Sequence, residues 1–487
     1  MNPALSHLSP MNSALSHFSR RQFFRRAGAG FGLLALNELL ARTGFAGTKN
    51  PLAPKTPHFP AKAKSVIWLF MNGGPSHVDT WDYKPELQMR DGQPLPDFDA
   101  KTGFFPDLVG PLMRSPFEWA QHGQSGTWAS SLFPNLAKQV DRLAFIHSMH
   151  TDSNNHSPAL FMMNTGTTRM GYPSAGSWVT YGLGSASEDL PAFIVMSDPK
   201  DRGLPKGNAS NWTAGFLPGV YQGTWLKPKG EPIDNLARPA DLTGERQREQ
   251  LDLLAKLNRA SLAESPAESE LAARIESFEL AYRMQTAAPD AFDLKSEPDS
   301  VRKLYGLDQP HCAHIAAQCL TARRLVERGT RFVQIYSGGM ENQLSWDCHR
   351  DLIGNHTGFA RETDQPFAAL IEDLVQRGML KDTLVVCAGE FGRLPISQKG
   401  AKPGRDHNPH AFTAWLAGGG VKGGVHFGET DDIGFRAAVD KVSVRDFHAT
   451  LLHALGLDHE KLTFPFQGLD ARLTGVEPSH VVTQIFA

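Results

Sequence analysis

Residues 65–71 read SVIWLFM, and residues 72–75 continue as NGGP. A short, unbroken apolar run that ends at a Gly-Gly-Pro turn predicts a buried strand that leads into a turn. We therefore place the start of the folded domain near residue 60, just ahead of this strand.

The same kind of run recurs along the chain and alternates with helical periodicity. We expect further strands over 332–336, 383–388 and 412–416, and helices over 313–326, 366–376 and 445–455. This alternation predicts an α/β fold with a parallel or mostly parallel sheet and helices on both faces. In such sheets, ligands bind at the carboxyl ends of the strands.

The alternation stops between about residues 199 and 300. Residues 199–235 are rich in Gly, Pro, Asn and Trp and predict an irregular loop, whereas residues 242–288 are charged and helical in pattern. We interpret the segment as an insertion, a loop with a helical cap, within a domain that spans residues 60–487.

Composition excludes several classes of protein. Of 487 residues, 41% are hydrophobic and 21% are charged, so the chain has enough apolar side chains for a large core. Lys plus Arg number 49 against 51 Asp plus Glu, which leaves no basic excess for nucleic-acid binding. Four cysteines in a chain of this length do not make a disulfide scaffold.

The N-terminal segment resembles an export signal. Ser19, Arg20 and Arg21 precede two phenylalanines, an apolar stretch follows over 27–41, and residues 44–46 read GFA. This order is typical of a twin-arginine signal over residues 1–46, although a Sec signal or an ordinary amphipathic helix is the alternative. We expect export through the twin-arginine translocase to the periplasm or cell envelope. No later run approaches the ~20 apolar residues of a membrane anchor.

Metal-binding residue types gather beside the predicted strands. A single such residue is usually a solvated polar group, but the joint placement predicts a site at one edge of the sheet. Imidazole together with carboxylate favours Zn, Mn or Fe, whereas sites made only of oxygen suit Ca or Mg. The candidates are Asn72, His77, Asp79, Asp347, His349, Glu390, Asp406, His407 and His410.

Several motifs resemble a family of exported, sulfatase-like proteins of unknown function within the alkaline phosphatase and sulfatase superfamily. They are MNGGPSHVDTWD at 71–82, WDCH at 346–349, GEFGR at 389–393, GRDHNPH at 404–410, VRDFHAT at 444–450 and RLT at 472–474. The resemblance implies a three-layer sandwich with a mostly parallel central sheet. It also implies a metal-dependent hydrolase of phosphate or sulfate esters that uses metal-activated water.

The resemblance also implies a set of ligands. Superfamily enzymes end their first strand with a metal-binding Asp, and this chain has Asn72 there, a weak ligand through its carbonyl. His77 and Asp79 follow closely and would take over this role. The other implied ligands are Asp347, His349, Glu390 and His407.

The slot of the superfamily nucleophile holds His156 in this chain, followed by Ser157 and Pro158, with Thr165-Gly166 at the matching distance. A formylglycine mechanism needs Cys or Ser in this slot, so we do not expect one. His156 is instead a metal ligand or water-orienting base, a covalent nucleophile, or a structural residue. Nearby His150 and Asp152 favour a polar pocket.

Two arginines, Arg393 and Arg169, would neutralise an anionic ester by paired hydrogen bonds, or would instead form surface salt bridges. The cofactor implied is a divalent ion, Zn or Mn and up to two of them, with Ca less suited. The substrate implied is a small anionic ester or a sulfated glycan. The alternatives are a catalytically inactive binding protein of the cell envelope and an assembly partner of other exported proteins.

Overall fold

The structure, a computed structural model, describes residues 50–233, 236, 238, 242–264 and 269–487. The predicted export signal at 1–46 lies outside the described residues. Residues 51–487 form one compact unit. Among the described residues, no helix has both the length and the apolar character needed to span a bilayer.

The buried run at 65–71 forms β1 (Ser65–Met71), which lies inside the main sheet. β1 pairs in parallel with β8 (Phe332–Ser337) on one side and with β9 (Thr383–Ala388) on the other. The strand order among the described residues is β14-β5-β13-β9-β1-β8-β6-β7, and β17 pairs with β5. The other strands of this main sheet are β5 (Leu143–His150), β6 (Phe193–Met196), β7 (Thr224–Leu226), β13 (Phe412–Ala417), β14 (Val425–Phe427) and β17 (Val442–Ser443).

The sheet is mostly parallel, as predicted, with one reversal. β13 runs antiparallel to both of its neighbours, β5 and β9. Segments that precede β13 therefore meet the sheet at the edge where the other strands end. β5 and β6 were not among the strands predicted from the sequence, although β5 leads directly toward the candidate site.

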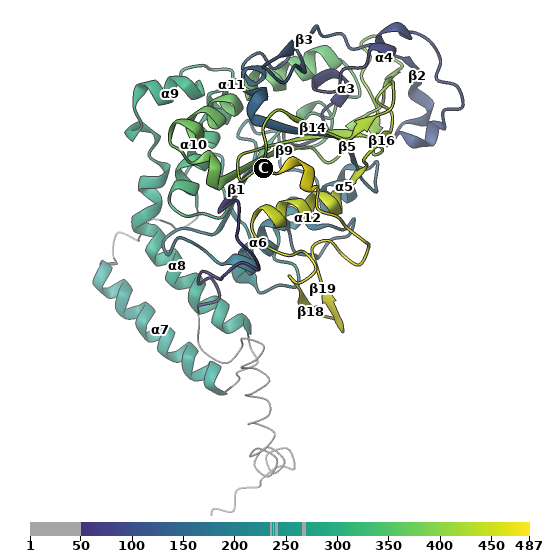
Figure 1. Cartoon of the computed structure of the whole chain (residues 1–487). Helices are drawn as coiled ribbons and strands as arrows, with labels where there is room; N and C mark the ends of the chain where they lie inside the picture. The colour runs from purple at the N-terminus through teal and green to yellow at the C-terminus, as the bar shows by residue number, and fades with distance from the viewer. Residues whose placement is uncertain (1–49, 234–235, 237, 239–241, 265–268) are drawn as a thin grey trace, which may run out of the picture. The chain divides into compact units, whose positions relative to one another are not determined.

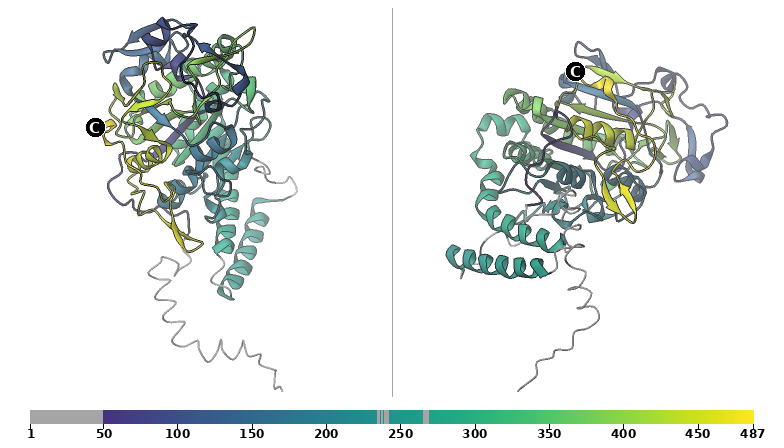
Figure 2. Two further views of the ribbon diagram at one scale, coloured as in Figure 1. Left: turned by 90° about the vertical axis from the view of Figure 1, so that its right-hand side faces the viewer. Right: turned by 60° about the horizontal axis from the view of Figure 1, so that its bottom comes forward.

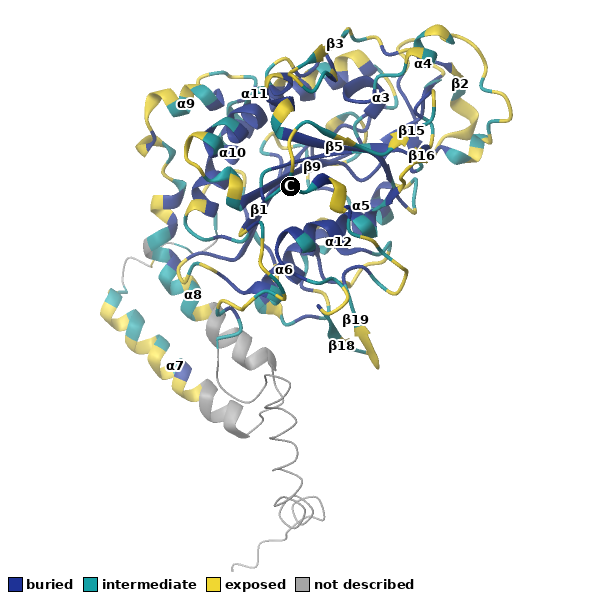
Figure 3. Cartoon of the chain, in the orientation of Figure 1, coloured by how far each residue is buried: buried dark blue, intermediate teal, exposed yellow. Residues whose placement is uncertain are grey.

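Each face of the sheet has its own core, because successive side chains of a strand point to opposite sides. In β1, Ile67 and Leu69 belong to one buried cluster, whereas Trp68 and Phe70 belong to the other. Figure 3 shows the sheet and the inner sides of the helices as buried. The predicted three-layer sandwich is confirmed.

Helices α9 (Asp299–Tyr305), α10 (Ala313–Glu327) and α11 (Leu352–Gln376) cover one face of the sheet. Helices α5 (His156–Thr165), α6 (Ala175–Leu183) and α12 (Val444–Ala454) cover the other (Figure 1). α11 starts earlier than the predicted 366–376 and continues through Pro366. Burial of its apolar side offsets the hydrogen bond that a proline removes from a helix interior.

The predicted insertion contains α7 (Gly244–Glu264) and α8 (Ser269–Phe292), which pack against each other. Figure 2 shows this pair extending beyond the sheet and its covering helices. α8 contacts α10 and the turn Gly219–Tyr221. Near the end of the insertion, Glu297 Oε2 forms a 2.7 Å ion pair with Nη2 of the buried Arg323, which fastens the segment to the core.

Candidate metal centre

Four side chains meet at the carboxyl edge of the sheet because of the strand directions. His156 follows β5, and Asp347 and His349 follow β8. His407 precedes β13, and the reversal of β13 brings it to the same edge. His407 also lies on β12 (His407–Asn408), which pairs with β10 (Gly392–Arg393) after β9.

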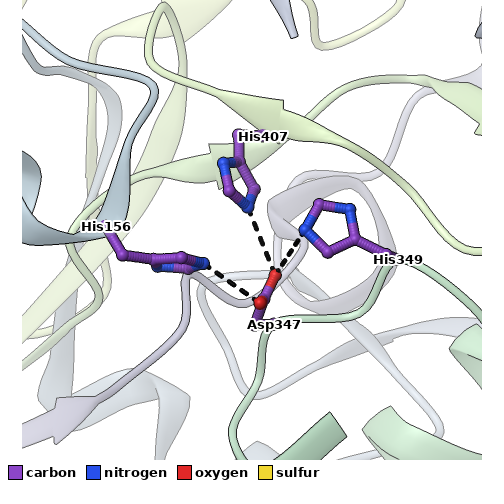
Figure 4. A group of neighbouring side chains, drawn as sticks. All are labelled: His156, Asp347, His349 and His407. Atoms are coloured by element: carbon purple, nitrogen blue, oxygen red, sulfur yellow. Dashed lines mark hydrogen bonds and ion pairs between the residues drawn. The ribbon is translucent and has the colours of Figure 1, made fainter. Parts of the chain in front are cut away.

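The three histidines converge on one carboxylate (Figure 4). His349 Nε2 lies 2.9 Å and His407 Nε2 lies 3.2 Å from Asp347 Oδ1, and His156 Nε2 lies 3.1 Å from Asp347 Oδ2. One ligand atom from each of the four residues lies within 4.8 Å of the others. His349 is the most exposed of the four, with 14% of its side chain accessible, so it is the member of the cluster that solvent reaches most.

The other ring nitrogen of each histidine has an oxygen partner. Nδ1 of His156 lies 2.7 Å from Glu390 Oε1, and Nδ1 of His407 lies 2.6 Å from the carbonyl oxygen of Asn154. Nδ1 of His349 lies 2.9 Å from Oε1 of Gln398. Such acceptors place the hydrogen on Nδ1 and leave the Nε2 lone pair free, which is the usual arrangement of histidines that bind metals.

The electrostatics of the cluster favour a further positive charge between the Nε2 atoms and Asp347, besides the guanidinium of Arg393. Burial and the neighbouring His156 hold the pKa of His407 well below its ordinary value, so neutral His407 directs a lone pair at the Asp347 carboxylate. The Nε2 atom of His156 is buried without a hydrogen-bond partner, because its contact with Asp347 is poorly directed for one. A divalent cation shared by the Nε2 atoms and the carboxylate satisfies both atoms, so the residues present fit the metal.

In the absence of a metal, a proton on His156 supplies the positive charge next to Asp347. Burial alone would lower the pKa of His156, but the negative charges of the adjacent Asp347 and Glu390 carboxylates outweigh burial and raise it to about 9. Burial alone would also raise the pKa of Asp347. The Arg393 guanidinium and the three histidines outweigh burial and hold the pKa well below its ordinary value. The Asp347 carboxylate is therefore ionised and available as a ligand.

Arg393 is committed to the protein rather than to a ligand. The side chain is fully buried, and its Nη2 lies 2.8 Å from Asp347 Oδ1. Its remaining donors reach the carbonyl oxygens of Gly73, Gly74 and Arg405. The structure thus places Arg393 as a residue that positions Asp347 and the turn after β1, in contrast to the predicted contact with an ester.

Glu390 and Asn72, both predicted as ligands, are not among the four residues of the cluster. Both carboxylate oxygens of Glu390 accept the backbone N–H of Gly73 at 3.0 Å, and Oε1 also holds His156. The amide nitrogen of Asn72 donates to the carbonyl oxygen of Gly339, and its Oδ1 is buried without a partner.

His77 and Asp79, expected to replace the missing Asp ligand, lie outside the group of four. They sit on the short helix α3 (His77–Thr80). Nε2 of His77 lies 2.7 Å from the carbonyl oxygen of Gly434. Asp79 Oδ2 forms a 2.6 Å ion pair with Nε of the fully buried Arg405. This carboxylate is therefore part of a buried structural ion pair.

Four further candidate residues predicted from the sequence also lie outside the group of four. Asp406 lies beside the cluster, where it accepts the backbone N–H groups of His407 and Phe105, each at 2.7 Å. Asp152 forms a 3.0 Å ion pair with Arg445. His150 and His410 are not in the group of four either.

Arg169 is exposed and lies beyond the far end of α5. His156 is the first residue of this 10-residue helix, which spans about 15 Å. Arg169 forms no hydrogen bond or ion pair with any of the four residues of the cluster, all of which the structure describes.

Sequence reasoning missed Asn154, Gln398, Phe104 and Phe105. Asn154 acts through its backbone carbonyl, and Gln398 comes from a separate two-stranded sheet, so neither has a local sequence signal. The two phenylalanines read as ordinary apolar residues, and their position beside the cluster follows only from the fold.

Fold and site together define a three-layer α/β protein with a metal-binding type of cluster at the carboxyl edge of its sheet. The chain belongs to the family described as "Protein of unknown function (DUF1501)", whose profile matches residues 63–486. A comparison with curated proteins finds no significant match.

Solved structures with partial likeness include the PsFucS1 sulfatase from Pseudoalteromonas sp., at 12% identity and TM-score 0.34, covering 89% of this chain and 72% of that one. The alkaline phosphatase from the Antarctic bacterium TAB5 has 12% identity and TM-score 0.32, covering 77% and 96%. The lipoteichoic acid synthase LtaP from Listeria monocytogenes has 10% identity and TM-score 0.33, covering 88% and 80%. At these TM-scores, we draw no conclusion about activity from them.

Proposed function

We propose that the protein is a divalent-metal-dependent hydrolase of phosphate or sulfate esters. One observation carries the proposal: three imidazoles, each held by an oxygen acceptor at Nδ1, present Nε2 to the single ionised carboxylate of Asp347. A purely structural polar cluster has no need to hold three imidazoles by Nδ1 and turn every Nε2 toward one carboxylate. The resemblance of the sequence motifs to sulfatase-like proteins supports the choice of ester.

His156, Asp347, His349 and His407 are the residues that would hold the cation. Three imidazoles with one carboxylate favour Zn or Mn over Ca, which prefers oxygen ligands. When bound, the cation supplies polarisation of the ester oxygen and activation of water. Among the described residues one group of this kind is present, so we propose one cation at this site.

The residues around the cluster have separate roles in the proposed reaction. Glu390 orients His156, and Arg393 keeps Asp347 ionised. The N-terminal end of α5 lies at the cluster, since His156 is its first residue, and the exposed N–H groups of a helix N-terminus favour an anion. Both ring nitrogens of His156 are directed at carboxylates, which leaves none for nucleophilic attack. Hydrolysis therefore proceeds by direct attack of water, without a covalent enzyme intermediate.

We also propose export through the twin-arginine translocase, supported by Arg20 and Arg21, with the residues after about 46 as the mature protein. Its substrate would then be a small anionic ester or a sulfated glycan of the cell envelope. A second candidate is a metal-containing binding protein without catalysis. Commitment of Arg393 to backbone carbonyls favours it, because no ester contact then comes from that residue.

Metal analysis of the purified protein, followed by assays with aryl phosphate and aryl sulfate, tests both candidates. The hydrolase requires about one Zn or Mn per chain and metal-dependent turnover of at least one ester. His407→Gln should lose the metal, whereas His77→Gln, another buried histidine, should keep it. Stoichiometric metal without turnover would support the binding protein instead, and a protein that takes up no divalent metal would refute both.

A further inference from the structure

Two exposed phenylalanines, Phe104 and Phe105, lie beside His407 and His349 of the cluster. Phe104 and Phe105 are 44% and 36% exposed, although large apolar side chains normally avoid water. The ring centroids of Phe105 and His349 lie 4.7 Å apart, and those of Phe104 and His407 lie 5.5 Å apart. Each phenylalanine therefore touches one of the candidate metal ligands while keeping part of its ring in solvent.

The backbone of this pair is fastened to the cluster. Asp406, next to His407, accepts the backbone N–H of Phe105 at 2.7 Å. Nδ2 of Asn154 donates to the carbonyl oxygens of Thr102 and Gly103 at 3.1 and 3.0 Å, while the Asn154 carbonyl oxygen holds His407. The same residues thus orient the candidate ligand His407 and hold the backbone of the aromatic pair next to it.

The two rings also have a fixed mutual geometry. Their centroids lie 5.1 Å apart at an interplanar angle of 82°, an edge-to-face arrangement. Because Phe105 packs against His349, the most exposed of the four candidate ligands, a molecule that contacts His349 from solvent also lies next to Phe105. A ring on that molecule would cover apolar surface that is otherwise exposed to water.

We propose that Phe104 and Phe105 form a binding platform for a ring in the alcohol part of the ester substrate, so that the protein selects esters of ring-bearing alcohols over esters of small alkyl alcohols. This inference rests on the proposed function and narrows its substrate class. An aromatic ring and the apolar face of a sugar ring offer the same contact, and separate probes distinguish them.

Binding to the purified, metal-replete protein tests the platform, with phosphorus NMR used to confirm that each probe is intact while its affinity is measured. The probes are phenyl phosphate, glucose 6-phosphate and methyl phosphate, with affinity measured by calorimetry and ring contact by saturation-transfer NMR. We expect at least one ring-bearing ester to bind about tenfold more tightly than methyl phosphate, the size of effect that one aromatic contact gives. The better of the two ring esters identifies the type of ring.

The Phe104→Ala/Phe105→Ala double variant should lose this preference and keep its affinity for methyl phosphate. The Phe104→Leu/Phe105→Leu variant keeps an apolar surface and separates ring stacking from simple burial. Phe278→Ala is the matched control, because Phe278 on α8 is 42% exposed and should not alter the preference. Thermal unfolding checks that each variant is folded.

The outcomes separate this inference from the proposed function. A binding preference that survives in the double alanine variant, or is absent in the wild type, overturns the platform even if esters are hydrolysed. A preference that depends on the two phenylalanines supports the platform even if no ester is turned over, which would refute hydrolysis alone. A protein that binds none of the probes overturns the platform, and the aryl phosphate and aryl sulfate assays decide the proposed function separately.

Discussion

His156 Nδ1 lies 2.7 Å from Glu390 Oε1, although 234 residues separate the two along the chain. Glu390 follows β9 and is held by the backbone N–H of Gly73 after β1. Three segments therefore fix the direction of one imidazole. This contact favours the tautomer in which the hydrogen is on Nδ1 and Nε2 of His156 is the candidate ligand atom.

Replacing Glu390 by Gln should weaken metal binding about 10- to 100-fold, the usual effect of losing the partner of a ligating histidine. The neutral amide is a poorer acceptor for the Nδ1–H group and also removes one negative charge. Competition with a chromophoric chelator measures the change. Glu362→Gln, which removes a buried carboxylate paired with Arg202, is the control and should leave the metal affinity unchanged. Equal effects of the two variants would contradict a specific role for Glu390.

Replacing Arg393 by Met should destabilise the fold by about 3–5 kcal/mol, the cost of leaving one partner of a buried ion pair without the other. Asp347 would then have a buried negative charge without the guanidinium that now offsets burial. Urea unfolding of the metal-free protein measures the effect. A variant as stable as the wild type that has only lost activity would return Arg393 to a role at the ester.

Removal of the metal by a chelator should lower the melting temperature, because a ligand that binds only the folded state stabilises it by about 4 kcal/mol at a thousandfold excess over its Kd. Added Zn or Mn should restore the original value. In His407→Gln the chelator should have little effect. If the wild type melts at the same temperature with and without chelator, the cluster is not a resident metal site.

Acid should destabilise the protein between about pH 6.5 and 4. Burial lowers the pKa of His147 and of His448 to about 4, and that of His356 to about 3. Below pH 6.5 the unfolded chain binds protons at these residues and the folded chain does not, so the free energy of unfolding falls as the pH falls. Each group lowers it by about 1.4 kcal/mol per pH unit between its unfolded and its folded pKa.

The urea midpoint measured from pH 7 to pH 4.5 checks this expectation, and His448→Gln should reduce the slope. The sign is decisive. A midpoint that rises on acidification would mean that these histidines are not buried as neutral groups.

Hydrolysis of a phosphate ester made chiral at phosphorus should invert its configuration, since direct attack of water is a single in-line displacement. Retention would require a covalent intermediate. That result would make His156 the nucleophile, despite the contacts of its ring nitrogens with Asp347 and Glu390.

Local patterns were sufficient for the elements that make up the core. The apolar run at 65–71 and the segments that became β8, β9 and β13 are continuous in sequence, and a short apolar run between turn residues has few alternatives to a buried strand. Because ligands bind at the carboxyl ends of strands in such sheets, Asp347, His349 and His407 were also predicted as candidate ligands from the sequence. The missed strand β5 and the early start of α11 show where local pattern alone was not sufficient.

By itself, then, the sequence determined the α/β class, the main strands and the chemical types of the ligands, because these depend on local periodicity and side-chain chemistry. Only the tertiary structure decided which polar residues meet. Asp79 is paired with Arg405, Arg393 with Asp347, and Phe104 lies against His407. These pairings join distant segments, and the direction of β13 and the turn after β1 position them, so no local spacing could have indicated them.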